Sequence, residues 1–222
     1  MTDQAQSVSG TIAGHGGEPG ETRRDFLILV AGAMGVLGAG AVGYALIDSM
    51  NPAADILAAG EPVEVDLSKV QPGQQIIVLW RGKPVFIVDR TPSLVKTLQN
   101  PKLVDRLSDP DSTTNQQPPY ARNWHRSIDP KYAVLVGICT HLGCIPSFFP
   151  NPDPANPAPD WLGGYFCPCH GSKYDLAGRV FRSVPAPYNL PVPPYNFPNK
   201  TTLRIGENPP PEQWDFNSIE QV

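Results

Sequence analysis

The longest apolar stretch of the chain lies near the N-terminus and predicts a helix that crosses a membrane. No charged side chain occurs between Phe26 and Leu46. As a helix rising ~1.5 Å per residue, this run would be roughly 32 Å long, enough to span a hydrocarbon core of about 30 Å. A cleaved secretory signal is the alternative, but its apolar region is normally about 7 to 15 residues long. We therefore predict a retained anchor.

The charges on either side of this span predict its orientation. Arg23 and Arg24 precede it, Asp48 follows it, and no lysine or arginine then occurs until Lys69. Since positive charge favours the cytoplasmic side, we expect a cytoplasmic N-terminus and an exported remainder. The stretch Thr22 to Leu27, TRRDFL, also resembles the twin-arginine export motif, with two ordinary flanking arginines as the alternative. That route carries folded proteins, which suits a cofactor inserted before export because metal binding and folding are coupled.

The composition of the chain predicts four segments. Residues 1–21 are rich in Gly, Ser and Thr and are expected to be a disordered cytoplasmic N-terminus. Residues 22–47 form the predicted signal-anchor and transmembrane helix. Residues 48–62 are small and Ala-rich without strand alternation, so we expect a flexible tether, which fully extended at ~3.3 Å per residue would reach on the order of 50 Å. Residues 63–222 form the head domain.

Alternating apolar and polar positions separated by turns predict an all-β head built from antiparallel sheets. The turn Arg81 to Lys83 lies between two alternating runs and predicts a hairpin. Thr91 to Gln99 predicts one short helix with Thr91 as its cap and Pro92 at its first position. The polar stretch 108–127 is expected to be a loop, and a Pro- and Asn-rich insertion covers 150–160. Strands are predicted at 63–68, 74–80, 84–91, 132–138 and 165–166.

Composition narrows the class of function. The 222 residues can bury one good core, and the 27 prolines and 20 glycines favour short strands joined by turns. A formal net charge of -4 provides no basic field for phosphates, so nucleic-acid binding is excluded. We interpret Lys173, Arg179 and Arg182 as solvated charges, and His125 as a surface residue that packs near Trp124.

Two short motifs contain all four cysteines and two of the four histidines. They are CTHLGC at 139–144 and CPCHGS at 167–172, and each predicted strand that precedes them delivers one motif at its end. Six such side chains exceed the four ligands that most metals take. A structural zinc site is one interpretation, although a C-x-H pair is not zinc-finger spacing. Two plain disulfides with bystander histidines are another.

The pair of motifs closely resembles the Rieske iron-sulfur family, whose clusters have two cysteine and two histidine ligands. The shared core covers about 137–191, which would hold the cluster-binding loops. Soluble ferredoxin-like and oxygenase-type members lack the extra cysteine pair, so this pair and the anchor are similar to the Rieske subunits of quinol-oxidising cytochrome bc complexes. The resemblance implies an all-β Rieske-type head with a small cluster-binding subdomain, plus one N-terminal transmembrane helix.

The resemblance also implies one [2Fe–2S] cluster per chain. Cys139 and Cys167 would bind one iron, and His141 and His170 would bind the other at the exposed tip, where these imidazoles carry the quinol chemistry. Two neutral imidazoles in place of two thiolates remove negative charge from the site, which raises its reduction potential.

The remaining cysteines, Cys144 and Cys169, are expected to form a disulfide. Members with a membrane anchor have this extra pair, and an exported domain lies in an oxidising compartment. The bridge would hold the two ligand loops together.

Further residues acquire roles from the resemblance. His170 would contact the quinol oxygen. Ser172 and Tyr174 would donate hydrogen bonds to a bridging sulfide and to a cysteine sulfur, raising the potential. Leu142 would shield the cluster and dock on the cytochrome b subunit. The segment 184–187, VPAP, resembles the proline loop that covers the cluster, although the usual leading glycine is a valine here.

The implied function is electron transfer in a proton-translocating respiratory complex. The subunit would oxidise ubiquinol at the cytochrome b subunit and pass the electron to a c-type cytochrome subunit. It would lie in the lipid bilayer of a bacterial inner membrane, with its head in the periplasm and within a dimeric complex. The alternatives are the Rieske subunit of another exported oxidoreductase, such as an arsenite oxidase, and a zinc-binding exported module.

Overall fold

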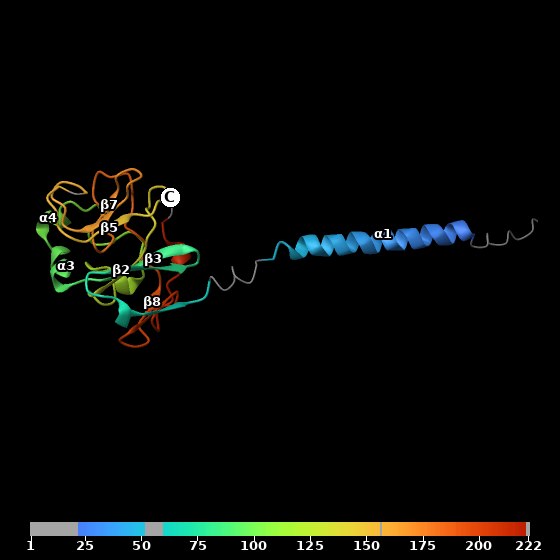
Figure 1. The fold of residues 1–222 in the computed structure, drawn as a ribbon, viewed down its shortest axis with the longest axis horizontal. Coiled ribbons are helices and arrows are strands. Elements are labelled where there is room, and N and C mark those ends of the chain that lie inside the picture. Colours follow the sequence, from blue (N-terminus) through green and yellow to red (C-terminus); the bar gives the residue numbers. More distant parts are fainter. Residues whose placement is uncertain (1–21, 52–59, 156, 221–222) are drawn as a thin grey trace, which may run out of the picture. The chain divides into compact units, whose positions relative to one another are not determined.

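The computed structural model describes residues 22–51, 60–155 and 157–220. The chain divides into two units, Met1–Pro52 and Ala53–Val222, which correspond to the anchor helix and the head in Figure 1. The expected cytoplasmic N-terminus, 1–21, and the middle of the expected tether, 52–59, lie outside the described residues.

The N-terminal unit contains one long helix, α1 (Arg23–Asp48). Thr22 caps it, since its side chain accepts from the Asp25 N–H at 3.3 Å and the Asp25 carboxylate accepts from the Thr22 N–H at 3.1 Å. This reciprocal capping box satisfies two donors of the first turn. Within the described residues, α1 is the one helix long and apolar enough to cross a membrane, and none of its side chains is buried. The predicted helix therefore forms and begins at the two arginines.

The base of the head consists of two antiparallel three-stranded sheets, ordered β1-β9-β8 and β2-β3-β4. The predicted hairpin is confirmed, and its turn contains Arg81 and Gly82 at φ 50° and 70°, the left-handed pair that joins twisted strands tightly. The strands are β1 (Val63–Asp66), β2 (Gln75–Trp80), β3 (Lys83–Asp89), β4 (Tyr132–Val136), β8 (Tyr195–Asn196) and β9 (Thr202–Ile205).

A third antiparallel sheet, β5-β6-β7, carries the motif region. Figure 1 shows β5 and β7 at one end of the head and β8 at the other, with β2 and β3 between them. The third sheet rests on the second through Phe86, whose ring stacks on Tyr165 with 5.4 Å between centroids. A Cβ atom on Gly137 would come within 2.3 Å of the Phe86 ring, so this approach requires glycine. The strands are β5 (Ser147–Phe149), β6 (Gly164–Phe166) and β7 (Lys173–Tyr174).

Short helices fill the connections. The predicted helix is α3 (Pro92–Thr97), and the Thr91 side chain accepts from the Leu94 N–H as expected of its cap. A second helix, α4 (Pro101–Val104), follows from the same signals, because Asn100 caps it and a proline begins it. The predicted loop 108–127 contains only the 3-10 turn η2 (Pro119–Ala121). The others are η1 (Leu67–Lys69) and η3 (Phe216–Ser218).

Buried charge is the main departure from the sequence prediction. Arg179, expected to be solvated, is 1% exposed, and its Nη2 lies 2.7 Å from Asp175 Oδ2. The prediction was wrong because an arginine four residues after an aspartate can bury its charge by pairing within one turn. Arg182 is exposed, as expected. The prediction that His125 packs beside Trp124 is confirmed by an edge contact of 4.8 Å.

Candidate metal centre

The two cysteine motifs form loops with the same backbone frame. The first loop (139–144) follows β4 and the second (167–172) follows β6. In both, the first residue donates its N–H to the carbonyl oxygen of the sixth at 2.8 Å, and the fifth donates to the carbonyl of the first at 3.0 Å. The fifth residues are Gly143 and Gly171, at φ 83° and 78°, where glycine costs no strain. Two strand ends therefore present two equivalent loops.

A disulfide joins the two loops. Cys144 and Cys169 are bonded across 25 residues of sequence, with their Cα atoms 6.7 Å apart. By the chain-entropy model, closing a loop of this length stabilises the fold by about 3.5 kcal/mol. The sulfur of Cys167 lies within 4.8 Å of both bridged sulfurs. These three do not form a metal site, because two are already bonded to each other.

Two thiols remain free, and both are buried. Cys139 is 3% exposed and Cys167 is 2% exposed. Burial raises the pKa of the Cys167 thiol, and the neighbouring Cys139 adds to that shift. A buried thiol pair of this kind is poorly placed to ionise unless a cation lies against it, and a bound metal supplies that charge. The pair is therefore suited to metal thiolate chemistry.

The two motif histidines lie together at the surface of the head. The rings of His141 and His170 meet edge to face with 4.8 Å between centroids. His141 is half-buried and His170 is exposed. The Nδ1 atom of His141 is buried and has no hydrogen-bond partner within the described part of the chain. An orphaned imidazole nitrogen in the same pair of loops as two buried free thiols fits a metal group with mixed nitrogen and sulfur ligands.

Tyr174 connects the third sheet to the first loop. Its hydroxyl donates to Cys139 Sγ at 3.2 Å and accepts from the Thr140 N–H at 3.2 Å. Burial raises the pKa of Tyr174 above its usual range, and the contact with Cys139 adds to this. The hydroxyl therefore remains a donor to the sulfur. β7 fixes its position, since Tyr174 pairs with Tyr165 of β6.

The proline segment 184–187 is hydrogen-bonded to the second loop, and the chain just beyond it to the first. The Ala186 N–H donates to Ser172 Oγ at 3.1 Å, which leaves the hydroxyl proton of Ser172 free to point elsewhere. Thr140 Oγ1 donates to the Tyr188 carbonyl at 2.7 Å. The left-handed residue of this region is Ser183, at φ 57°, so a valine at position 184 is accommodated without strain. Sequence reasoning missed Thr140, although its place between two ligand candidates was a signal.

The surface around the histidines is apolar. Leu142 is 69% exposed and Ile145 is 57% exposed. A cavity of ≈ 400 Å³ lies beside the first loop. One of its walls comes from the C-terminal segment, through Phe216 and Ile219, which the sequence pattern did not associate with the site.

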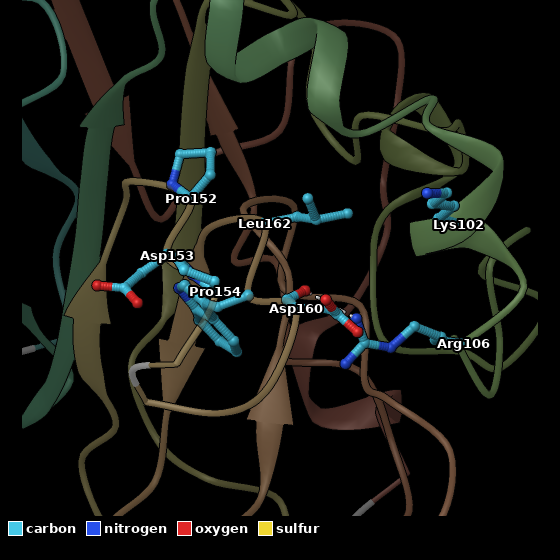
Figure 2. Close-up of a pocket in the computed structure, with 8 residues that line it drawn as sticks. Lys102, Arg106, Pro152, Asp153, Pro154, Asp160 and Leu162 are labelled. Carbon is cyan, nitrogen blue, oxygen red and sulfur yellow. Dashed lines mark hydrogen bonds between the residues drawn. The ribbon is translucent and has the colours of Figure 1, made fainter.

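A second cavity, of ≈ 410 Å³, involves none of the motif residues. Figure 2 shows Arg106 reaching Asp160, and the Nη1 group donates to the Asp160 carbonyl at 2.9 Å. The Arg106 guanidinium also lies over the Phe181 ring at 5.0 Å. Arg106 therefore fastens the 150–160 insertion to the segment after α4. The lining residues are Lys102, Arg106, Pro152, Asp153, Pro154, Asp160, Trp161 and Leu162.

The β fold, the paired loops, the bridged cysteines and the free thiol and imidazole groups together define a Rieske-type [2Fe–2S] protein with a helical anchor. Residues 109–195 match the model of the Rieske [2Fe-2S] domain. Residues 13–53 match the model described as Ubiquitinol-cytochrome C reductase Fe-S subunit TAT signal. The chain belongs to the ubiquinol-cytochrome c reductase iron-sulfur subunit family, as its similarity to curated relatives shows.

These relatives bear the name ubiquinol-cytochrome c reductase iron-sulfur subunit. The one from Allochromatium vinosum is 49% identical over 188 residues, covering 84% of this chain and 89% of the relative. The one from Rhodospirillum rubrum is 46% identical, covering 88% and 97%. The one from Blastochloris viridis is 45% identical, covering 83% and 93%. The predicted family, fold class, [2Fe–2S] cofactor and twin-arginine signal are confirmed, and neither the arsenite oxidase nor the zinc interpretation is favoured.

Proposed function

We propose that this chain takes one electron at a time from ubiquinol and passes it to a c-type cytochrome, as a redox subunit working beside a cytochrome b subunit. The names of its relatives support this reaction. The observation that carries the proposal is the paired imidazoles of His141 and His170 at the surface, backed by two buried thiols. In this arrangement the imidazoles at the surface can contact quinol, while the sulfur ligands stay shielded from water.

Four residues would hold the cluster. Cys139 and Cys167 are assigned to the inner iron because their thiols are buried. His141 and His170 are assigned to the outer iron because their rings meet nearer the surface. When bound, the cluster supplies one-electron chemistry at a potential raised by its two neutral imidazole ligands.

The outward nitrogens of the histidines would handle the proton. Because Nδ1 is the enclosed nitrogen of His141, we assign it to the metal, which leaves Nε2 for hydrogen bonding. His170 is the more exposed of the two rings, so we assign it to the quinol hydroxyl. Its free nitrogen accepts the hydroxyl hydrogen bond and then the proton. Proton and electron thereby leave quinol at the same tip.

The apolar rim would dock on the membrane-embedded partner. Leu142 and Ile145 expose most of their side chains beside the histidines, and burying them against cytochrome b would exclude water from the contact. Ser172 and Tyr174 would tune the potential from behind, by donating hydrogen bonds to sulfur. Docking would thus use exposed residues of the site, and tuning would use buried ones.

The anchor would place the head in the bacterial periplasm. α1 fits a membrane-anchored subunit in length and composition. Arg23 and Arg24 at its start favour a cytoplasmic N-terminus. We propose 22–47 as the signal-anchor, 48–62 as the tether and 63–222 as the head, within a dimeric complex in the inner-membrane lipid.

The purified native complex tests this function directly. We expect a reddish-brown protein with iron and acid-labile sulfide in equal amounts, which co-purifies with b-type and c-type haems. Ubiquinol should reduce the cluster, and oxidised cytochrome c should restore it. A colourless protein containing zinc would contradict the redox assignment, and a cluster that ubiquinol cannot reduce would contradict the substrate.

A further inference from the structure

In the part of the head that the structure describes, two buried arginines make no ion pair. Arg90 is 1% exposed and Arg126 is 0% exposed. Arg179 is equally buried but pairs with Asp175 at 2.7 Å. Within the described ranges, neither Arg90 nor Arg126 has a carboxylate oxygen within ion-pair distance. A buried charge without an opposite partner is costly, so two positive charges in the interior need an explanation.

Neutral acceptors surround Arg126. Its Nη1 group donates to the Leu190 carbonyl at 2.8 Å and to the Ala177 carbonyl at 3.1 Å. Its Nη2 group donates to Gln117 Oε1 at 2.7 Å. These bonds satisfy the donors but do not cancel the charge. Burial lowers the pKa of Arg126 to about 9, in keeping with a cation held in a poorly solvated place.

Arg90 is held in the same way. Its Nη1 group donates to the His125 carbonyl at 3.0 Å, and its Nη2 group donates to Ser127 Oγ at 2.8 Å. Nε of Arg90 is buried without a partner in the region described. Burial lowers the pKa of Arg90 to about 10. The head thus fixes a second guanidinium with neutral acceptors.

A short chain of contacts links Arg126 to the first loop. It bonds the Leu190 carbonyl, two residues beyond Tyr188, and the Tyr188 carbonyl accepts from Thr140 Oγ1 at 2.7 Å. Thr140 follows Cys139 directly. With ~3.8 Å between successive Cα atoms and the side chains at both ends added, this path keeps the guanidinium within on the order of 20 Å of the Cys139 sulfur. Arg126, Leu190 and Cys139 are buried, and Thr140 and Tyr188 are half-buried. Salt therefore screens the interaction less than it would screen a pair of surface charges.

We propose that Arg126 raises the reduction potential of the cluster through its charge, assisted by Arg90, whose Nη1 group also donates to the Leu176 carbonyl at 3.4 Å, two residues beyond Tyr174. This rests on the proposed function, since it takes Cys139 and Cys167 as cluster ligands. The reduced cluster carries one more negative charge than the oxidised cluster, so fixed positive charge nearby stabilises the reduced form more. Ser172 and Tyr174 act on sulfur by hydrogen bonds, whereas the arginines act by their field.

Charge-changing variants separate this role from a purely structural one. Arg126→Gln should lower the midpoint potential in a redox titration followed by visible circular dichroism, while Arg126→Lys, which keeps the charge, should stay near the native value. Asp175→Asn removes a buried negative charge and should raise the potential. A purely structural role of Arg126 predicts a different result, because lysine cannot replace the planar guanidinium fork. Both Arg126 variants would then shift alike.

Equal shifts in Arg126→Lys and Arg126→Gln, or an unchanged or lower potential in Asp175→Asn, would overturn the proposal. If Arg126→Gln fails to assemble a cluster, Arg90→Gln against Arg90→Lys provides the same comparison. If no glutamine variant assembles, Asp175→Asn and Arg126→Lys decide together: an upward shift in the first with a near-native potential in the second supports the proposal, and any other result overturns it. Iron and sulfide content is measured in every sample. A native protein without a cluster would contradict the proposed function, whereas a normal cluster insensitive to these charges would contradict only this inference.

Discussion

Replacing Tyr174 by phenylalanine should lower the reduction potential of the cluster without removing it. The substitution keeps the buried ring in β7 but deletes the hydroxyl that donates to Cys139 Sγ at 3.2 Å. A hydrogen bond to sulfur stabilises the reduced cluster more than the oxidised one, because the reduced form is more negative. Losing this hydrogen bond therefore favours the oxidised cluster and lowers the reduction potential.

The size of the expected shift in potential follows from the strength of this hydrogen bond. A hydrogen bond to a charged acceptor contributes about 1.5–3 kcal/mol. If between a third and a half of this differs between the redox states, the reduced form loses about 0.5–1.5 kcal/mol, which for one electron is about 20–65 mV. The variant should also unfold more easily, because the Thr140 N–H, which bonds the same hydroxyl at 3.2 Å, loses an acceptor, at a cost of about 1–3 kcal/mol.

Tyr165 provides a matched control. It pairs with Tyr174 across β6 and β7, and its hydroxyl is buried with no hydrogen-bond partner in the part of the head described. Tyr165→Phe removes a hydroxyl from the same sheet without removing a bond to sulfur. Both variants would be titrated by electron paramagnetic resonance with redox mediators, alongside the native protein. A Tyr174→Phe potential no lower than that of Tyr165→Phe would refute the tuning role.

Four further substitutions test the ligand assignment, the disulfide and the packing behind the site. His141→Ala should abolish the cluster, and a retained reduced-state paramagnetic signal would exclude His141 as a ligand. Cys144→Ser and Cys169→Ser should weaken cluster retention equally, singly and together, since each removes one bridge; unequal iron loss on dilution would argue against that simple role. Gly137→Ala should destabilise the head by about 1–3 kcal/mol in urea unfolding, because the new Cβ meets the Phe86 ring; an unchanged midpoint would show that the ring moves freely.

The local elements of this fold could be predicted from sequence because their signals are local. The hairpin turn at Arg81 and Gly82 and the cap at Thr91 each depend on a few adjacent residues. The pairing of β1 with β9 could not be predicted in this way, because Val63 and Ile205 meet across most of the chain. Strands of two residues, such as β7 and β8, are too short to show any alternation.

The site, too, could be predicted only where its sequence signals are local. The motif cysteines and histidines are unusual enough in type and spacing to indicate a [2Fe–2S] centre. The buried arginines are not, since an arginine in a polar stretch has the same local pattern whether it is solvated or enclosed. Only the aspartate four residues before Arg179 was a usable signal. The carbonyls that hold Arg126 come from residues 116–190 and converge only in the folded chain.

The pairing of β1 with β9 has a consequence for synthesis and export. The first strand of the head pairs with one near the C-terminus. The β1-β9-β8 sheet therefore cannot form until almost the whole chain has left the ribosome. The N-terminal signal emerges long before this. An export route that takes unfolded chains could begin transport during that interval, whereas a route that takes folded domains cannot. The order of the strands therefore imposes a delay between translation and transport, and truncation before residue 202 should leave the signal attached to a head that never becomes competent for export.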